Sequence, residues 1–194
     1  YYSDIDKNGS VDPIITFFID GVSYPFPYLD DLISQVPSLR KKYLYYKDYA
    51  SATIESLMPD NSIENVPVVF ANKFQSVVLK NEGNRLLLTD LPIQAQFSPI
   101  YSILKTDANQ DGWDDLILTG NLTQTRVRFG RYDANHGILL LGNGKCEFTY
   151  VPQYESGLNL RGDIRSSIEI NDLLIFGVNA DSIQLYKNTM KSAK

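Results

Sequence analysis

This 194-residue chain has few of the residues on which many enzymes and disulfide-linked domains depend. It has one cysteine, Cys146, so no disulfide can form within the chain. It has one histidine, His136, which argues against a zinc site with several histidine ligands and against a Ser-His-Asp triad. We expect Cys146 to be packed in a strand and His136 to lie in a turn.

Long apolar runs and an excess of positive charge are missing as well. No stretch approaches the roughly 18 apolar residues that a membrane-spanning helix needs, so we expect no membrane insertion. The formal net charge at pH 7 is −5, from 23 acidic and 18 basic residues. That balance disfavours binding to nucleic acid or to an anionic membrane surface.

One nonapeptide pattern, D-x-[DN]-x-[DN]-G-x-x-D, occurs twice in the chain. The first copy runs from Asp4 to Asp12 and the second from Asp107 to Asp115. Ca²⁺ is a hard cation that takes roughly six to eight oxygen ligands. Alternating oxygen side chains, a glycine at a sharp turn and a closing aspartate are what a short loop needs to surround it. The pattern therefore predicts two calcium sites.

The two nonapeptides offer matching ligands. Side-chain oxygens come from positions 1, 3, 5 and 9, and position 7 contributes its backbone carbonyl. The first loop supplies Asp4, Asp6, Asn8, Asp12 and the carbonyl of Ser10. The second loop supplies Asp107, Asn109, Asp111, Asp115 and the carbonyl of Trp113. One such match could be a solvated acidic turn, but two matches that each precede an apolar run favour metal sites.

An EF-hand is the obvious alternative for loops of this kind. It needs a bidentate glutamate at position 12 and a helix after the loop. Position 12 is Ile15 in the first loop and Leu118 in the second. The segments that follow, 13–19 and 116–121, are short apolar or β-branched runs that predict strands. The sequence therefore predicts calcium loops that lead into a sheet.

The rest of the chain predicts mainly β structure, interrupted by helices. Three segments read as strand, turn and strand, with glycine or asparagine in the turns: 74–91, 137–150 and 165–188. The last of these lacks the acidic nonapeptide, so we expect no metal there.

The two acidic loops begin 103 residues apart, at Asp4 and Asp107, and a helical insertion at about 25–62 accounts for much of this spacing. Asp30 is suited to cap a short helix, and Ser38 to start a longer one that lasts to about Leu57. Seven residues fall near one face of the longer helix: Leu39, Tyr43, Tyr46, Tyr49, Ala50, Thr53 and Leu57. Pro59 and the polar residues after it predict its end.

The unit of acidic loop and strand resembles the FG-GAP/VCBS repeat, the blade unit of integrin-α-like β-propellers. The fullest match covers residues 98–121 and continues over 130–144. This order is similar to the C-terminal part of long secreted bacterial VCBS-repeat proteins, the group with ASPIC/UnbV-type relatives. The resemblance covers most of the chain. It implies a mainly β fold, a partial β-propeller of about three blade-like units with a helical insertion, in a single domain over 1–194.

Three blades seldom close a ring, so we expect a fragment of a longer protein. An open arc of blades has free strand edges, which we expect to allow self-association.

In such repeats calcium holds the strands of a blade together, and the propeller is usually a binding or scaffolding module. The resemblance therefore implies a calcium-stabilised segment of an extracellular, periplasmic or cell-surface protein that binds a protein or a glycan. A purely structural domain and a non-catalytic part of a polysaccharide-active enzyme are the alternatives. Outside the loops the acidic residues show no spacing typical of a catalytic pair, so we do not expect an enzyme.

Overall fold

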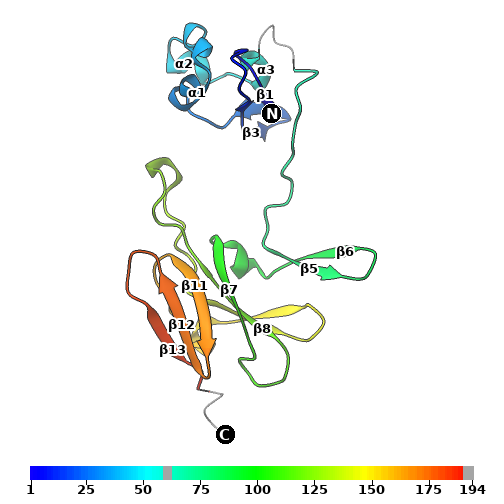
Figure 1. Ribbon diagram of the computed structural model, residues 1–194, viewed down its shortest axis with the longest axis vertical. Helices are drawn as coiled ribbons and strands as arrows, with labels where there is room; N and C mark the ends of the chain where they lie inside the picture. The colour runs from blue at the N-terminus through cyan, green and yellow to red at the C-terminus, as the bar shows by residue number, and fades with distance from the viewer. Residues whose placement is uncertain (59–62, 190–194) are drawn as a thin grey trace. The chain divides into compact units, whose positions relative to one another are not determined.

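Antiparallel strands make up most of the regular structure, and short helices lie mainly in the N-terminal part (Figure 1). The computed structural model describes residues 1–58 and 63–189. The sheets in these residues are all open, and none closes into a barrel. The predicted mainly β fold is thus confirmed. The chain divides into two compact units, Tyr1–Asn72 and Lys73–Lys194, whereas the sequence predicts one domain.

The first unit combines two antiparallel strand pairs with short helices. Its strands are β1 (Tyr2–Ser3) paired with β2 (Asp12–Pro13), and β3 (Thr16–Ile19) paired with β4 (Val22–Pro25). Its helices are α1 (Leu29–Gln35), η1 (Pro37–Lys41), α2 (Tyr46–Tyr49) and α3 (Ile54–Leu57). Ile5, within the first acidic loop, and Ile14, just after it, share one apolar core with these helices. The predicted helix end at Pro59 lies outside the described residues.

Helices do occupy the predicted insertion, but the single long helix over residues 38–57 is wrong. That range holds η1, α2 and α3 with non-helical breaks between them. Ala52 and Ile54, which lie off the predicted face, are buried, whereas Tyr46, which lies on it, is exposed. The breaks let the chain turn so that these apolar side chains reach a small core. The weak helix propensity of tyrosine and threonine offers little resistance to these breaks. The residue at the N-cap of α1 is Tyr28, not Asp30, and it makes no side-chain cap hydrogen bond.

The second unit contains one isolated hairpin and two larger antiparallel sheets. The hairpin pairs β5 (Val77–Asn81) with β6 (Leu86–Asp90). The four-stranded sheet has the order β10-β9-β8-β7 and comprises β7 (Ile100–Thr106), β8 (Asp115–Gly120), β9 (Ile138–Gly142) and β10 (Phe148–Val151). The three-stranded sheet comprises β11 (Ile164–Ile170), β12 (Leu173–Val178) and β13 (Gln184–Lys187).

Short helical turns connect the strands of the second unit: η3 (Ile93–Gln96), η4 (Val127–Phe129) and α4 (Gln153–Ser156). The three predicted strand-turn-strand segments are confirmed. Within the described residues, no helix is long and apolar enough to cross a membrane.

Two residues that occur once in the chain lie beside β9. His136 lies in the bend before this strand, as predicted, and its Nδ1 is 3.1 Å from the carbonyl oxygen of Leu160. Cys146 lies in the turn after it, with a φ of 64°, and its side chain is exposed. The prediction that Cys146 is packed in a strand is therefore wrong.

The four-stranded sheet has an apolar core on each face, because alternate residues of a strand point to opposite sides. On one face, Leu104 and Ile117 belong to the same core as Phe176 of the three-stranded sheet. On the other face, Leu118 packs with Ala95 of η3. The two larger sheets of the second unit therefore share one apolar core, and Ser102 of β7 is hydrogen-bonded to Ser167 of β11.

The outer face of the three-stranded sheet is apolar but uncovered within the second unit. Ile168 pairs with Ile175, which in turn pairs with Leu185, so these side chains line one face. Ile168 and Leu185 are each 54% exposed, and Ile170 on the same face is 51% exposed. Contiguous apolar surface of this kind marks an interaction face in soluble proteins.

Candidate metal-binding loops

The first acidic nonapeptide forms the connection between β1 and β2. Pairing of Ser3 with Asp12 closes the loop at its base. The carboxylates of Asp4, Asp6 and Asp12 converge, with one oxygen of each lying within 4.8 Å of the others. Asp12 is only 3% exposed, and the other two are half-buried. Three converging carboxylates repel one another unless a cation neutralises them, so this arrangement suits a metal ion.

Five hydrogen bonds from backbone N–H groups hold the side chains of each loop, and they recur at the same positions in both. In the first loop they run from Asn8 to Asp4 (2.9 Å), Gly9 to Asp4 (2.8 Å), Asn8 to Asp6 (3.2 Å), Ser10 to Asn8 (2.8 Å) and Ile5 to Asp12 (2.9 Å). In the second they run from Asp111 to Asp107 (3.1 Å), Gly112 to Asp107 (3.1 Å), Asp111 to Asn109 (3.2 Å), Trp113 to Asp111 (2.8 Å) and Ala108 to Asp115 (2.8 Å).

The backbone conformation repeats as well. Position 4 has a positive φ in both loops, 59° at Lys7 and 61° at Gln110. Position 6 has a φ of 90° at Gly9 and 87° at Gly112, a conformation that glycine adopts without steric cost. The two loops are far apart in the chain and belong to different compact units, yet they share one conformation.

The second loop is tied to more of the sheet than the first. It connects β7 with β8 and ends at Asp115, which is fully buried. The Oδ1 atom of Asp115 accepts a hydrogen bond from the backbone N–H of Gly142 in β9, at 2.9 Å. After β13, the side-chain amide of Asn188 donates to the carbonyl oxygen of Ala108, at 3.2 Å. An ion in this loop would therefore fasten three strands of one sheet and the end of another.

Trp113, at position 7 of the second loop, lies against the turn between β9 and β10. A Cβ atom placed on Gly144 would overlap the indole ring, and Gly144 has a φ of 73°, so this turn position requires glycine on both counts. The ring is 51% exposed on its other side. Trp113 is the single tryptophan of the chain, so its fluorescence reports on the second loop and on the turn that it contacts.

The loops differ in how their acids are distributed. The first has aspartate at position 3 and asparagine at position 5, whereas the second has Asn109 and Asp111 at those positions. In the second loop the Asn109 amide donates to the Asp111 carboxylate, at 2.9 Å. Among the described residues, the cluster of three converging acids therefore occurs only in the first loop. Each loop still offers three carboxylates and one amide oxygen, an all-oxygen set that suits Ca²⁺ better than zinc or copper.

A buried polar network at the end of β8 was not predicted from the sequence. Asn121 is 1% exposed and has a φ of 82°. Its Oδ1 accepts from the Ser98 hydroxyl (2.8 Å) and the Asn135 N–H (2.9 Å). Its Nδ2 donates to the carbonyls of Asn135 (2.8 Å) and Gly162 (3.1 Å). The network fastens β8 to the segments before β9 and β11. Asparagine is common directly after strands, so Asn121 alone could not predict this buried network.

No model of a known protein family, no curated protein and no solved structure shows a significant match to this chain. The geometry of the two loops therefore carries the functional argument.

Proposed function

We propose that this chain is a calcium-stabilised segment of an FG-GAP/VCBS-type β-propeller in a secreted or cell-surface protein, where it acts as a protein- or glycan-binding module. The observation that carries the proposal is the recurrence of one loop structure. Two distant loops share a ligand pattern, five hydrogen bonds and two positive φ angles. Each loop also places three carboxylates within nine residues, and a bound cation would offset their repulsion.

Each loop would hold its ion with five groups at positions 1, 3, 5, 7 and 9. In the first loop these are the side chains of Asp4, Asp6, Asn8 and Asp12 and the carbonyl of Ser10. In the second they are the side chains of Asp107, Asn109, Asp111 and Asp115 and the carbonyl of Trp113. When bound, Ca²⁺ supplies positive charge that offsets carboxylate repulsion and cross-links the flanking strands.

The sheets of the second unit support a propeller arrangement. Strands β7 to β10 form one four-stranded antiparallel sheet in sequential order, which is the layout of a blade. A second sheet packs on one of its faces. The exposed side chains of Ile168, Ile170 and Leu185 on that second sheet then suit the packing of a further sheet. The free edges of β10 and β13 offer unpaired backbone groups, which supports self-association.

Two features favour a binding role over the alternatives, a purely structural domain or a non-catalytic part of a polysaccharide-active enzyme. First, Phe18 of β3 is 57% exposed and Tyr45 is 62% exposed, and exposed aromatic side chains are typical of binding surfaces. Second, loop sites of the extracellular kind bind calcium at roughly 10⁻⁴ to 10⁻³ M, so they are filled outside the cytosol. Such sites suit a protein that meets its partner at a cell surface.

Two assays test the proposal, each run in calcium and in EDTA. The protein is used to probe glycan arrays and serves as the bait in pull-down experiments. We expect binding to a partner in calcium that is lost in EDTA and reduced in Asp6→Ala and Asp111→Ala. The matched control is Asp114→Ala, which removes an exposed acid within the second loop at a position that is not a ligand. Partner binding of the same strength in calcium and in EDTA would contradict the proposal. So would a loss of binding in Asp114→Ala as large as the loss in Asp6→Ala or Asp111→Ala.

A further inference from the structure

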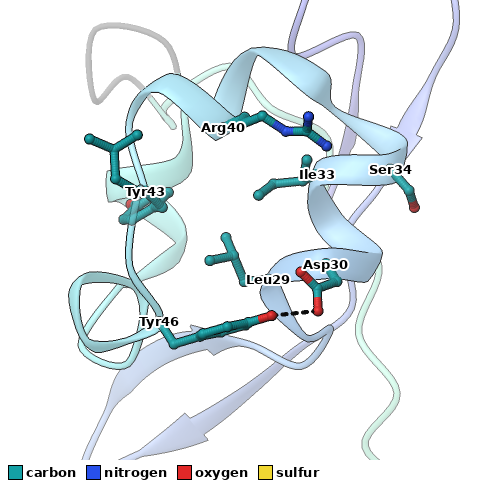
Figure 2. A pocket seen from close by; sticks show the side chains of 8 residues that line it. Leu29, Asp30, Ile33, Ser34, Arg40, Tyr43 and Tyr46 are labelled. Atoms are coloured by element: carbon teal, nitrogen blue, oxygen red, sulfur yellow. Dashed lines mark hydrogen bonds between the residues drawn. The ribbon is translucent and has the colours of Figure 1, made fainter.

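The helical part of the first unit contains an open pocket that is separate from both acidic loops. It lies among α1, η1 and the segment that enters α2, and its volume is about 390 Å³ (Figure 2). Its lining includes the apolar side chains of Leu29 and Ile33 and the aromatic side chains of Tyr43 and Tyr46. A concave site with apolar walls and a few polar groups is the usual form of a small-ligand site.

Two opposite charges stand at the rim of this pocket. The Asp30 carboxylate accepts a hydrogen bond from the Tyr46 hydroxyl at 2.7 Å, and Figure 2 shows the two groups directed at each other. This hydrogen bond and the charge of Asp30 raise the pKa of Tyr46, so its phenol stays a donor at neutral pH. Arg40 extends over Ile33 from another side of the pocket. Its guanidinium makes no hydrogen bond or ion pair with the residues that the structure describes.

The chemistry of the pocket selects among ligands. A guanidinium binds a carboxylate through two parallel hydrogen bonds. The free oxygen of Asp30 accepts hydrogen bonds from hydroxyl groups, and its negative charge disfavours a group of higher negative charge, such as a phosphate monoester. The ring of Tyr46 and the aliphatic side chains of Leu29 and Ile33 suit the apolar C–H face of an amphipathic saturated ring. A ligand that combines one carboxylate, several hydroxyls and an apolar ring face is an acidic sugar.

We propose that this pocket binds a uronate, with the sugar carboxylate on Arg40, its hydroxyls on Asp30 and its ring against Tyr46. The inference rests on the proposed function and gives the glycan its chemical class. The pocket is open, and Leu44 beside it is 72% exposed, so a sugar within a longer polysaccharide could enter.

The test is a titration of the full chain, in excess calcium, with D-galacturonate and with neutral D-galactose, followed by ¹H–¹⁵N chemical shifts. We expect millimolar uronate binding with shifts at α1 and η1, and weaker binding of galactose. Arg40→Gln should weaken uronate binding about tenfold and remove the preference over galactose. Lys41→Gln, which removes the same charge at a neighbouring position that does not line the pocket, should change neither.

Three results would overturn the inference: no shifts at the pocket, an equal loss in Lys41→Gln, or tighter binding of a zwitterion such as alanine. The last result would mean that the two charges recognise an amino acid instead. Each of these results leaves the calcium response of the loops intact. If the loops fail to bind calcium, the proposed function fails, while the uronate titration still reports on the pocket.

Discussion

Substitution of Asp111 by alanine tests metal binding by the second loop, because it separates a loss of calcium binding from a loss of folding. The side chain is exposed, so its removal leaves no buried group without a partner. It accepts one backbone hydrogen bond, from Trp113 at 2.8 Å, which water can replace in the variant. Asp111→Asn provides a second variant that keeps this acceptor and copies Asn8 at the same position of the first loop. Both variants should therefore fold normally without metal.

The size of the effect follows from mass action. With a dissociation constant near 0.1 mM, calcium at about 1 mM stabilises the state that binds it by roughly 1.4 kcal/mol. For a unit of this size that corresponds to a rise in melting temperature of roughly 4–8 °C. Asp111→Ala should lose most of this rise, and Asp111→Asn should lose part of it.

The assay is thermal unfolding followed by Trp113 fluorescence, in 1 mM calcium and in EDTA. The wild-type protein should melt at a higher temperature in calcium than in EDTA. Asp111→Ala should match the wild type in EDTA and fall below it in calcium, whereas Asp114→Ala should keep the calcium response. A decrease in melting temperature that is the same in both buffers would refute the reasoning, because it would show that Asp111 supports the loop without metal.

Three further predictions concern other parts of the chain. Asn121→Ala should lower the free energy of unfolding by about 3–5 kcal/mol, because it leaves buried partners without hydrogen bonds; a loss below about 1 kcal/mol in urea unfolding would contradict this. Burial raises the pKa of Tyr49 to about 12, so the folded state favours its neutral phenol. Stability of the first unit should therefore fall as the pH rises from 10 towards 12. Tyr49→Phe should reduce that loss in circular dichroism melts, and an unchanged pH profile would count against the assignment. The wild-type chain should self-associate with rising concentration in sedimentation experiments, through the outer face of the three-stranded sheet and the free strand edges. Ile168→Glu should associate less, because it places a charge on that face; equal association of the two would show that the face takes no part.

The strands of the second unit were predictable because their signals are local. Short apolar runs between turns that contain glycine or asparagine indicate β5, β6 and β8 to β13 without knowledge of the rest of the chain. The sequence signals for the acidic loops are local as well. Their ligands lie within nine residues, so the spacing of oxygen side chains and the position of Gly9 and Gly112 indicate the turn that the structure shows.

Features that depend on distant parts of the chain were missed. The helices of the first unit break where Ala52 and Ile54 reach the core, which no helical periodicity indicates. Asn121 gathers partners from positions 98, 135 and 162, and only the folded chain brings these together. The pocket beside Arg40 likewise exists only because separate helices meet around it.

The central claim is that both acidic loops bind calcium, and a crystal structure of the protein grown in millimolar calcium tests it most directly. We expect one density peak in each loop, about 2.3–2.6 Å from aspartate oxygens and from the carbonyl of Ser10 or Trp113. Well-ordered loops without a peak, with the carboxylates of Asp4 and Asp107 turned towards solvent, would contradict the account.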